Sequence, residues 1–259
     1  MDRTALDDLV IVIGTGGTTG RPKALTRIGP VMGQLFGQVE APMMISTLAP
    51  KDHFRADGSV AHERLASAGR PTPLVRVAIM DAKGELLPRG ETGEIVVRGP
   101  LVMRGYHRDP AATAAASAHG WHHTGDVGYL DDDGYLFIVD RAKDMVITGG
   151  FNVYSTEVEQ VVMRHPAVQD CAVVGLPDDL WGERVTVVVQ LLPGATAPPD
   201  EIRAFARERP GGVKAPKQVE IWPDLPRSKV GKVLKREIKD SLLADGRAAM
   251  PRVPRRPPA

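Results

Sequence analysis

Residues 127–144 read VGYLDDDGYLFIVDRAKD, and this stretch decides how the chain divides. Two apolar runs, 127–130 and 135–139, flank the sequence DDDG, which is a strong signal for a β-hairpin. The charged residues of DRAKD follow at once, and beyond them the pattern of apolar residues changes. We therefore predict that a β-rich region ends here and place a domain boundary at residues 141–144.

Short strands are predicted on the N-terminal side of this boundary. Residues 75–80 and 93–98 are apolar runs separated by turn residues, so the region from about 70 to 140 is predicted to form a small antiparallel sheet or barrel. Farther upstream, the β-branched run 9–13 leads into a loop rich in Gly and Thr.

Helices and strands both follow the boundary. Thr156 is predicted to cap a helix that stops before Pro166, and another helix is predicted to begin near Pro199 with Ile202, Phe205 and Ala206 on one face. Strands are predicted at 168–174, 184–192 and 218–222, with a last helix at 235–243. Residues 141–243 therefore read as a compact α+β domain, and residues 244–259 as a disordered tail.

Composition excludes several classes of protein. The 259 residues carry a formal net charge of +1, which gives no reason to expect nucleic acid or an anionic membrane as a partner. No apolar stretch is long enough to span a bilayer, and no signal peptide is apparent, so we expect a cytoplasmic protein. Cys171 is the single cysteine, which excludes an intrachain disulfide, and it is predicted to be a buried strand thiol.

Six short motifs carry the functional signal. The first is a loop, TGGTTGRPK at 15–23, whose small residues and lysine suit a polyphosphate, although its spacing is not that of a Walker A loop. The others are FGQVE at 36–40, WHHTGD at 121–126, DRAKD at 140–144, GGFNV at 149–153 and PRSKVGK at 226–232. In this order, from about residue 7 to 243, they resemble the adenylate-forming superfamily of acyl- and aryl-CoA ligases, luciferases and peptide-synthetase adenylation domains.

The resemblance implies a mixed α/β (α+β) fold and a two-step reaction. The fold would be a remnant of the large adenylation domain (1–140) with its small antiparallel sheet or barrel, followed by the mobile α+β C-terminal domain (141–243). ATP and a carboxylic acid would give an acyl-adenylate, from which CoA would then displace AMP. Mg²⁺ is expected to bridge phosphate oxygens while charge builds on the α-phosphate.

The resemblance also assigns residues to these steps. Glu40 matches the acidic residue that helps to hold Mg²⁺, and Lys232 matches the mobile catalytic lysine of the adenylation step. Lys143 matches the hinge on which the C-terminal domain turns. The remaining matches are contacts to ATP and CoA: Thr15, Thr18, Thr19, Gly20 and Lys23 in the phosphate loop, Asp126 and Arg141 at the ribose, and Gly149, Gly150 and Phe151 beside the pantetheine thiol.

Each motif alone also has a plain structural explanation. Asp126 is equally explained as a turn residue, Arg141 with Asp144 as a surface ion pair, and Lys232 as part of a solvated basic face. His122 and His123 lack a third ligand at useful spacing, so we expect them on a strand surface and not at a metal. The ordered set of motifs, and not any single one, carries the resemblance.

The chain departs from the family pattern between the phosphate loop and the FGQVE motif. Lys23 is separated from that motif by only about a dozen residues, which indicates an internal deletion of most of the acyl pocket. Apolar side chains that packed on the lost segments would form an exposed patch, open to a second copy or a complementing subunit. Its candidates are Val31, Met32, Leu35, Phe36, Met43, Met44 and Ile45.

Two alternatives to an acid–CoA ligase remain open from the sequence. One is a non-catalytic remnant or binding module that keeps the C-terminal fold. The other is an adenylation subunit that loads a carrier protein instead of CoA.

Overall fold

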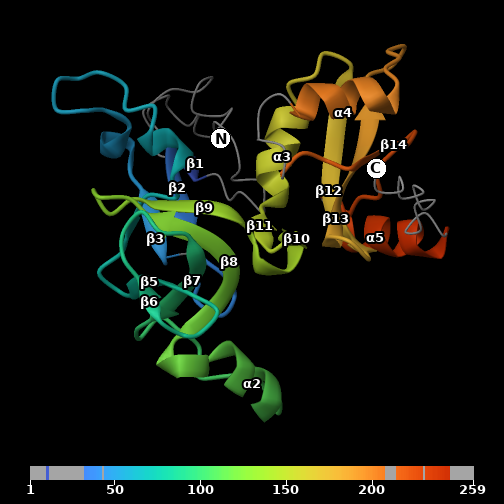
Figure 1. The fold of residues 1–259 in the computed structure, drawn as a ribbon. Helices are drawn as coiled ribbons and strands as arrows, with labels where there is room; N and C mark the ends of the chain where they lie inside the picture. The colour runs from blue at the N-terminus through green and yellow to red at the C-terminus, as the bar shows by residue number, and fades with distance from the viewer. Residues whose placement is uncertain (1–9, 12–31, 43, 208–213, 230, 246–259) are drawn as a thin grey trace, which may run out of the picture. The chain divides into compact units, whose positions relative to one another are not determined.

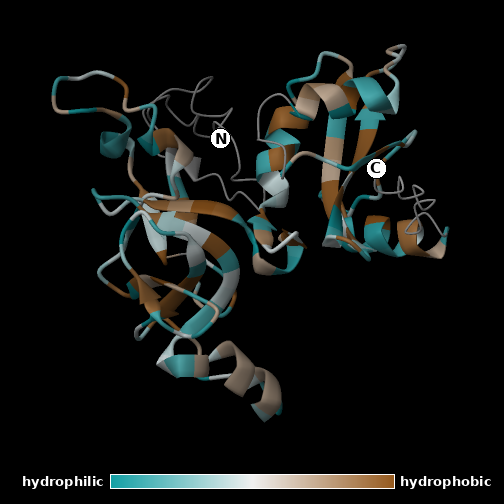
Figure 2. Ribbon diagram, in the orientation of Figure 1, coloured by the Kyte–Doolittle hydropathy of each residue, from teal (hydrophilic) through white to brown (hydrophobic). Residues whose placement is uncertain are grey.

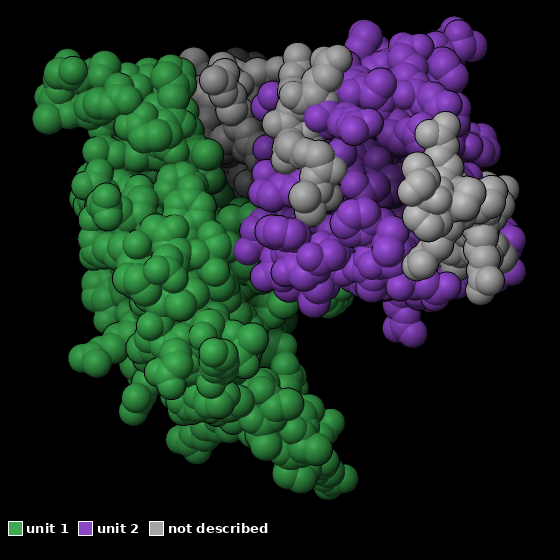
Figure 3. Space-filling model, in the orientation of Figure 1, with its two compact units in different colours: residues 1–143 green, residues 144–259 purple. Residues whose placement is uncertain are grey.

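The computed structural model describes residues 10–11, 32–42, 44–207, 214–229 and 231–245, and the chain forms two compact units. Unit 1 comprises residues 1–143 and unit 2 residues 144–259 (Figure 3). The predicted phosphate loop and residues 246–259 of the predicted tail (244–259) lie outside the described residues. Ala244 is the last residue of a helix, so the predicted start of the tail at residue 244 is wrong.

The first sheet of unit 1 has four short strands, in the order β1 (Val10–Ile11), β2 (Met32–Phe36), β3 (Ser46–Leu48) and β4 (Arg70–Pro71). Strands β1 and β2 are parallel, and the other two pairs are antiparallel. Two short 3₁₀ helices, η1 (Pro50–His53) and η2 (Arg64–Ala66), lie in the connection between β3 and β4 (Figure 1).

The second sheet of unit 1 has five antiparallel strands in the order β6-β5-β7-β8-β9. Its edges are β6 (Leu86–Leu87) and β9 (Leu136–Arg141), so of the two predicted arrangements, sheet or barrel, the described strands form an open sheet. The predicted strands are confirmed as β5 (Arg76–Met80) and β7 (Gly93–Arg98), and β8 (His122–Leu130) is longer than predicted. Helix α2 (Pro110–Ala116) and η3 (Ala118–Gly120) connect β7 to β8.

Two small apolar clusters stabilise unit 1. One contains Ala41, Ile45, Val75 and Val97, and the other contains Ala68, Ile79, Ile95 and Leu136. Phe36 packs against both. Ile45 is fully buried, so its predicted place in an exposed patch is wrong. Of the other candidates, Leu35 and Phe36 are half-buried and Met44 is exposed, while Val31, Met43 and the side chain of Met32 are not described.

The described residues of unit 2 form a five-stranded sheet. Its strands follow the order β11 (Phe151–Val153), β10 (Val146–Thr148), β13 (Gly182–Leu191) and β12 (Val168–Asp178), and β14 (Gln218–Ile221) pairs in parallel with β13. The helices are α3 (Ser155–Val162), α4 (Pro199–Arg207) and α5 (Lys235–Ala244). Helix α3 begins at Ser155, and its N-cap residue Tyr154 makes no side-chain cap, so the predicted capping role of Thr156 is wrong.

The long β12–β13 pair is covered on both faces. Side chains alternate along a strand, so Val173 faces one side and its neighbours Ala172 and Val174 face the other. Helices α3 and α4 cover the first face, and α5 covers the second. Figure 2 shows that α3 and α4 each carry both hydrophobic and hydrophilic residues, as expected of helices that cover a sheet on one side only. Cys171 is buried on the first face, as predicted.

Among the described helices, none has both the length and the apolar character needed to cross a membrane.

Candidate functional site: a polar cavity in unit 1

A polar cavity of about 330 Å³ opens in unit 1 beside the start of β8. Its wall combines the loop that follows β2, the first residues of β8 and the last residue of β9. The lining residues are Gly37, Gln38, Val39, Glu40, Tyr106, His122, His123, Thr124 and Arg141. Two residues that the family resemblance selected, Glu40 and Arg141, therefore line one cavity, and Asp126 contacts both Arg141 and Gln38 in its wall.

Strand pairing brings Asp126 and Arg141 together. The two residues are direct partners across β8 and β9, and Arg141 Nε lies 2.7 Å from Asp126 Oδ1. The carboxylate is almost fully buried, with 6% of its side chain exposed, whereas the arginine side chain is 45% exposed. A buried carboxylate needs hydrogen-bond donors, and Arg141 supplies one while its guanidinium stays open to the cavity. Arg141 therefore pairs with Asp126 and not, as the plain explanation had it, with Asp144.

Gln38 links three parts of the cavity wall. Its Nε2 donates to the carbonyl oxygen of Thr124 at 2.7 Å and to Asp126 Oδ2 at 3.1 Å. Its Oε1 lies 3.3 Å from His122 Nε2. Because Oε1 is an acceptor, His122 Nε2 is the donor in that contact. The amide thus fixes the second oxygen of the Asp126 carboxylate while Arg141 holds the first.

His122 is buried, so its predicted position on a strand surface is wrong. Burial lowers the pKa of this imidazole, and the negative charge of Glu40 opposes that shift. A hydrogen bond to the backbone of Ala116 also opposes the shift, and burial outweighs both. His122 also lines a second, more apolar cavity of about 300 Å³ that reaches toward α2.

Glu40 is held at both its backbone and its side chain. Its carbonyl oxygen accepts from the amide of Met103 at 2.7 Å, and its Oε1 accepts from the Tyr106 hydroxyl at 2.9 Å. A backbone hydrogen bond and then the Tyr106 hydroxyl lower the pKa of Glu40, with smaller contributions from His122 and Arg141. The side chain is therefore poised as a carboxylate beside the cavity.

The environment of Glu40 suits a magnesium ion. Mg²⁺ in nucleotide sites is usually held by one or two carboxylates together with substrate phosphates and water. Glu40 offers one ionised carboxylate, whose Oε1 accepts from the Tyr106 hydroxyl at the edge of the cavity. The described residues contain no cluster of three or more His, Cys, Asp or Glu that could hold a metal ion without phosphate oxygens.

The remaining predicted site residues lie elsewhere. Thr15, Thr18, Thr19, Gly20 and Lys23 fall outside the described residues. Lys143 is exposed in η4 (Ala142–Asp144), at the end of unit 1. Gly149, Gly150, Phe151 and Lys232 belong to unit 2. Lys232 is exposed on a turn where its amide donates to Ser228 Oγ at 3.2 Å.

The turn at Gly149 and Gly150 connects β10 to β11 and requires glycine. Both residues have positive φ, +58° and +81°, a region in which a Cβ atom is disfavoured. A Cβ on Gly149 would lie 2.9 Å from Cε3 of Trp181, and the Gly149 amide donates to the Trp181 carbonyl oxygen at 2.8 Å. Phe151, beside this turn, is 59% exposed.

Several residues of the cavity wall lie outside the predicted site, among them Gln38, Tyr106 and His122. Gln38 and His122 lie inside quoted motifs, two and four residues from Glu40 and Asp126, but nothing in their spacing shows that they touch. Tyr106 lies 66 positions from Glu40, and only the three-dimensional structure joins them.

Comparisons with known proteins agree with this arrangement. The family model described as AMP-binding enzyme matches residues 24–107, and the model for the C-terminal domain of AMP-binding enzymes matches residues 157–232. The first match begins directly after the predicted phosphate loop, and the internal deletion at that point stays a prediction.

Named relatives are CoA ligases. A medium/long-chain-fatty-acid–CoA ligase of Mycobacterium tuberculosis is 46% identical over 84% of this chain and 38% of its own length. A 2-succinylbenzoate–CoA ligase of Geobacillus kaustophilus is 39% identical over 86% of this chain and 44% of its own. This chain therefore spans about two fifths of the length of these relatives.

Solved structures share the fold. ATP-bound MatB from Rhodopseudomonas palustris superposes with a TM-score of 0.72 at 34% identity, over 82% of this chain and 41% of that protein. The amide bond synthetase McbA from Marinactinospora thermotolerans gives the same TM-score at 42% identity, over 84% of this chain and 43% of its own. With matches to both parts of the family, at this level of identity, the chain belongs to the adenylate-forming superfamily of AMP-binding enzymes.

Proposed function

We propose that this chain carries the ribose-binding wall and the C-terminal domain of an ATP-dependent acid–CoA ligase. The observation that carries the proposal is the buried Asp126 carboxylate, held by Arg141 and Gln38 at the wall of a polar cavity. A fixed carboxylate with two acceptor oxygens is suited to a pair of vicinal hydroxyls such as those of ribose. The names of the relatives, which are ligases of fatty and aromatic acids with CoA, support the same activity.

In this proposal each residue has one task. Asp126 accepts hydrogen bonds from the ribose, Arg141 keeps that carboxylate oriented, and Glu40 holds Mg²⁺, which would neutralise charge on the phosphates. Lys232 would bring a positive charge to the acid and the α-phosphate, as a positioned point charge. Phe151 and the glycine turn would flank the pantetheine arm of CoA, and Lys143 would serve as the hinge.

Binding of AMP to the purified chain tests the nucleotide assignment. Loss of charged hydrogen bonds to the ribose is worth about 1.5–3 kcal/mol, so Asp126→Asn should weaken AMP about tenfold to a hundredfold in calorimetric titration. Asp132→Asn is the matched control, because Asp132 is an exposed residue in the β8–β9 turn. Equal affinity in the two variants would refute the assignment.

A second candidate is a nucleotide-binding module without turnover. This candidate is favoured because the chain spans only part of the length of its relatives, 38% in the case of the M. tuberculosis ligase. Exchange of labelled pyrophosphate into ATP separates the candidates, in the presence of a panel of fatty and aromatic acids. Acid-dependent exchange that is lost in Lys232→Ala would establish adenylation of the acid, the first step of the ligase reaction, whereas AMP binding without exchange would establish the module.

The acid substrate, the choice between CoA and a carrier protein, the assembly with a second copy or subunit, and a cytoplasmic location all stay predictions.

A further inference from the structure

Strand β8 carries a bulge next to the proposed ribose carboxylate. The register between β7 and β8 passes from Val96 opposite His123 to Glu94 opposite Val127. A single residue of β7, Ile95, therefore stands opposite three residues of β8, Thr124, Gly125 and Asp126. The ladder of backbone hydrogen bonds is interrupted at this point, so the backbone groups of the bulge need other partners.

Side chains supply those partners. Thr124 Oγ1 donates to the carbonyl oxygen of Ile95 at 2.7 Å and accepts from the amide of Asp126 at 3.1 Å. The Gly125 amide donates to Glu94 Oε1 at 3.0 Å. Gly125 has φ of +69°, the left-handed conformation that turns the chain so that Asp126 can face Arg141.

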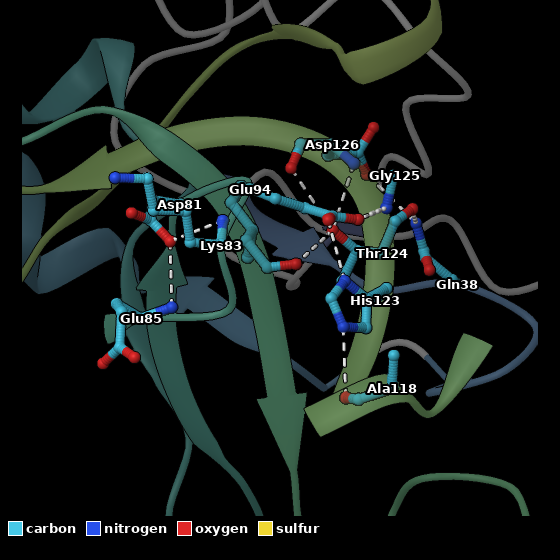
Figure 4. A network of polar contacts seen from close by, with 11 residues as sticks. Gln38, Asp81, Lys83, Glu85, Glu94, Ala118, His123, Thr124, Gly125 and Asp126 are labelled. Atoms are coloured by element: carbon cyan, nitrogen blue, oxygen red, sulfur yellow. Dashed lines mark hydrogen bonds and ion pairs between the residues drawn. The ribbon is translucent and has the colours of Figure 1, made fainter. Parts of the chain in front are cut away.

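Glu94 is itself fixed from its other oxygen. Its Oε2 lies 2.8 Å from His123 Nδ1, and His123 Nε2 lies 3.1 Å from the carbonyl oxygen of Ala118. Figure 4 shows the Glu94 side chain reaching from β7 to both His123 and Gly125, with Asp126 directly beyond. The side chains of Glu94 and His123 are 28% and 18% exposed, so solvent competes weakly for these contacts.

We propose that Glu94 is a positioning residue for nucleotide binding: its carboxylate holds the Gly125 amide and so fixes the bulge that presents Asp126 to the ribose. Glu94 is not among the residues that line the cavity, and both oxygens of its carboxylate contact the chain itself, at Gly125 and His123. The proposal rests on the proposed function, because it assigns Glu94 a role only through Asp126.

Two nucleotides separate positioning from general loss of structure. AMP carries both ribose hydroxyls, whereas 2′,3′-dideoxy-AMP lacks the groups that Asp126 would accept from. Glu94→Ala should weaken AMP about tenfold, the size expected when a site loses one well-placed polar contact. The same variant should leave the affinity for dideoxy-AMP unchanged.

Conservative and control variants sharpen the test. Glu94→Gln keeps a carbonyl oxygen that can accept from Gly125, so it should retain AMP affinity within about threefold. Glu91→Ala, which alters an exposed residue of the turn before β7, should bind both nucleotides like the wild type. Equal losses for AMP and dideoxy-AMP in Glu94→Ala, or no loss for AMP, would overturn the proposal.

The wild-type protein provides a measurement that needs no variant to fold. An amide that donates to a carboxylate is expected to exchange slowly and to resonate downfield, so the Gly125 amide should do both in an NMR spectrum of the full chain. Rapid exchange of that amide would also overturn the proposal. If instead Asp126→Asn binds both nucleotides like the wild type, the ribose assignment fails first and the role of Glu94 falls with it.

Discussion

The two units obtain their stability in different ways. In unit 2, the paired strands β12 and β13 are covered on both faces, by α3 and α4 on one side and by α5 on the other. The apolar cluster under α3 and α4 consists mainly of valines, whose β-branched side chains pack well on a pleated sheet. Burial on both faces of one long strand pair gives unit 2 two apolar clusters, one on each side of the sheet.

Unit 1 has smaller cores and more polar contacts. Its two clusters contain four buried residues each and share Phe36 as a half-buried neighbour. Around Asp126, side-chain hydrogen bonds replace part of the strand ladder. In unit 1 the register shift of β7–β8 lies beside Asp126, whereas the shift of β12–β13 in unit 2 lies at the start of β12, between Val168 and Asp170. Regular pairing is thus interrupted at the candidate site in unit 1 and at a strand end in unit 2.

The largest expected effect comes from the unit 2 core. Ile238 on α5 is fully buried, so Ile238→Ala should lower the stability of unit 2 by about 2–5 kcal/mol. Leu243→Ala on the same helix is the matched control, because Leu243 is 40% exposed and its loss should cost about 1 kcal/mol or less. Hydrogen exchange of the amides in β12 and β7 measures the effect in each unit.

Faster exchange in β12 alone would support separate cores. If Ile238→Ala accelerated exchange in β7 to the same extent, the two units would unfold together, and the statement that each is stabilised by its own core would be refuted.

The fold of unit 2 was predictable because its elements follow the periodicity of their own residues. The strands β12, β13 and β14 and the helices α4 and α5 lie where apolar patterns predicted them, within a few residues. The error at α3 was local: a Thr-x-x-Glu pattern (Thr156 and Glu159) suggested a cap, but Glu159 accepts from the Val173 amide at 2.8 Å and pairs with Lys235. Tertiary contacts decided the use of that side chain.

The site of unit 1 was predictable only in part. The resemblance placed Asp126, Arg141 and Glu40 in one reaction. The hairpin between β8 and β9 was predictable, but the pairing of Asp126 with Arg141 also depends on a register shift between Val127 and Gly128 that the sequence pattern does not show. The burial of His122 and of Ile45 was missed for a related reason. Both are covered by segments distant in the sequence, as the contact between His122 and Gln38, 84 positions apart, illustrates.

One glycine in each unit allows the cost of a positive φ angle to be compared between the units. Gly149 in unit 2 and Gly125 in unit 1 both have positive φ, so alanine at either position should cost about 1–2 kcal/mol. Only Gly149 has a neighbour in the way, Cε3 of Trp181, and nothing lies within 4 Å of a Cβ on Gly125. Gly149→Ala should therefore be the more destabilising of the two in urea unfolding.

A double-mutant cycle tests whether Trp181 causes the greater loss of stability in Gly149→Ala. In a Trp181→Ala background, the additional cost of Gly149→Ala over Gly125→Ala should disappear, because the contact has been removed. An excess that persists would place its origin in the backbone conformation and not in the tryptophan.

The smallest effect, and the one that separates the units by sign, is the dependence of stability on pH. Burial lowers the pKa of His53 and His122 in unit 1 from the ordinary value of 6.5. Below about pH 6.5 the unfolded chain binds protons that folded unit 1 resists, so unit 1 should lose stability as the pH falls. Burial raises the pKa of Cys171 in unit 2 well above 9.0, and this thiol should make unit 2 lose stability as the pH rises past 9.

Each group can contribute at most about 1.4 kcal/mol per pH unit, the free energy of one proton bound differently in the two states. The protection factors of backbone amides in β7 and β12, measured by hydrogen exchange across the pH range at constant temperature, report the stability of both units in one sample. His122→Gln should flatten the acid limb in β7, and Cys171→Ala should flatten the alkaline limb in β12. If His122→Gln changed the pH dependence of protection in β12, or Cys171→Ala changed it in β7, the two units would share one unfolding equilibrium. The different construction of the two units would then have no consequence for stability.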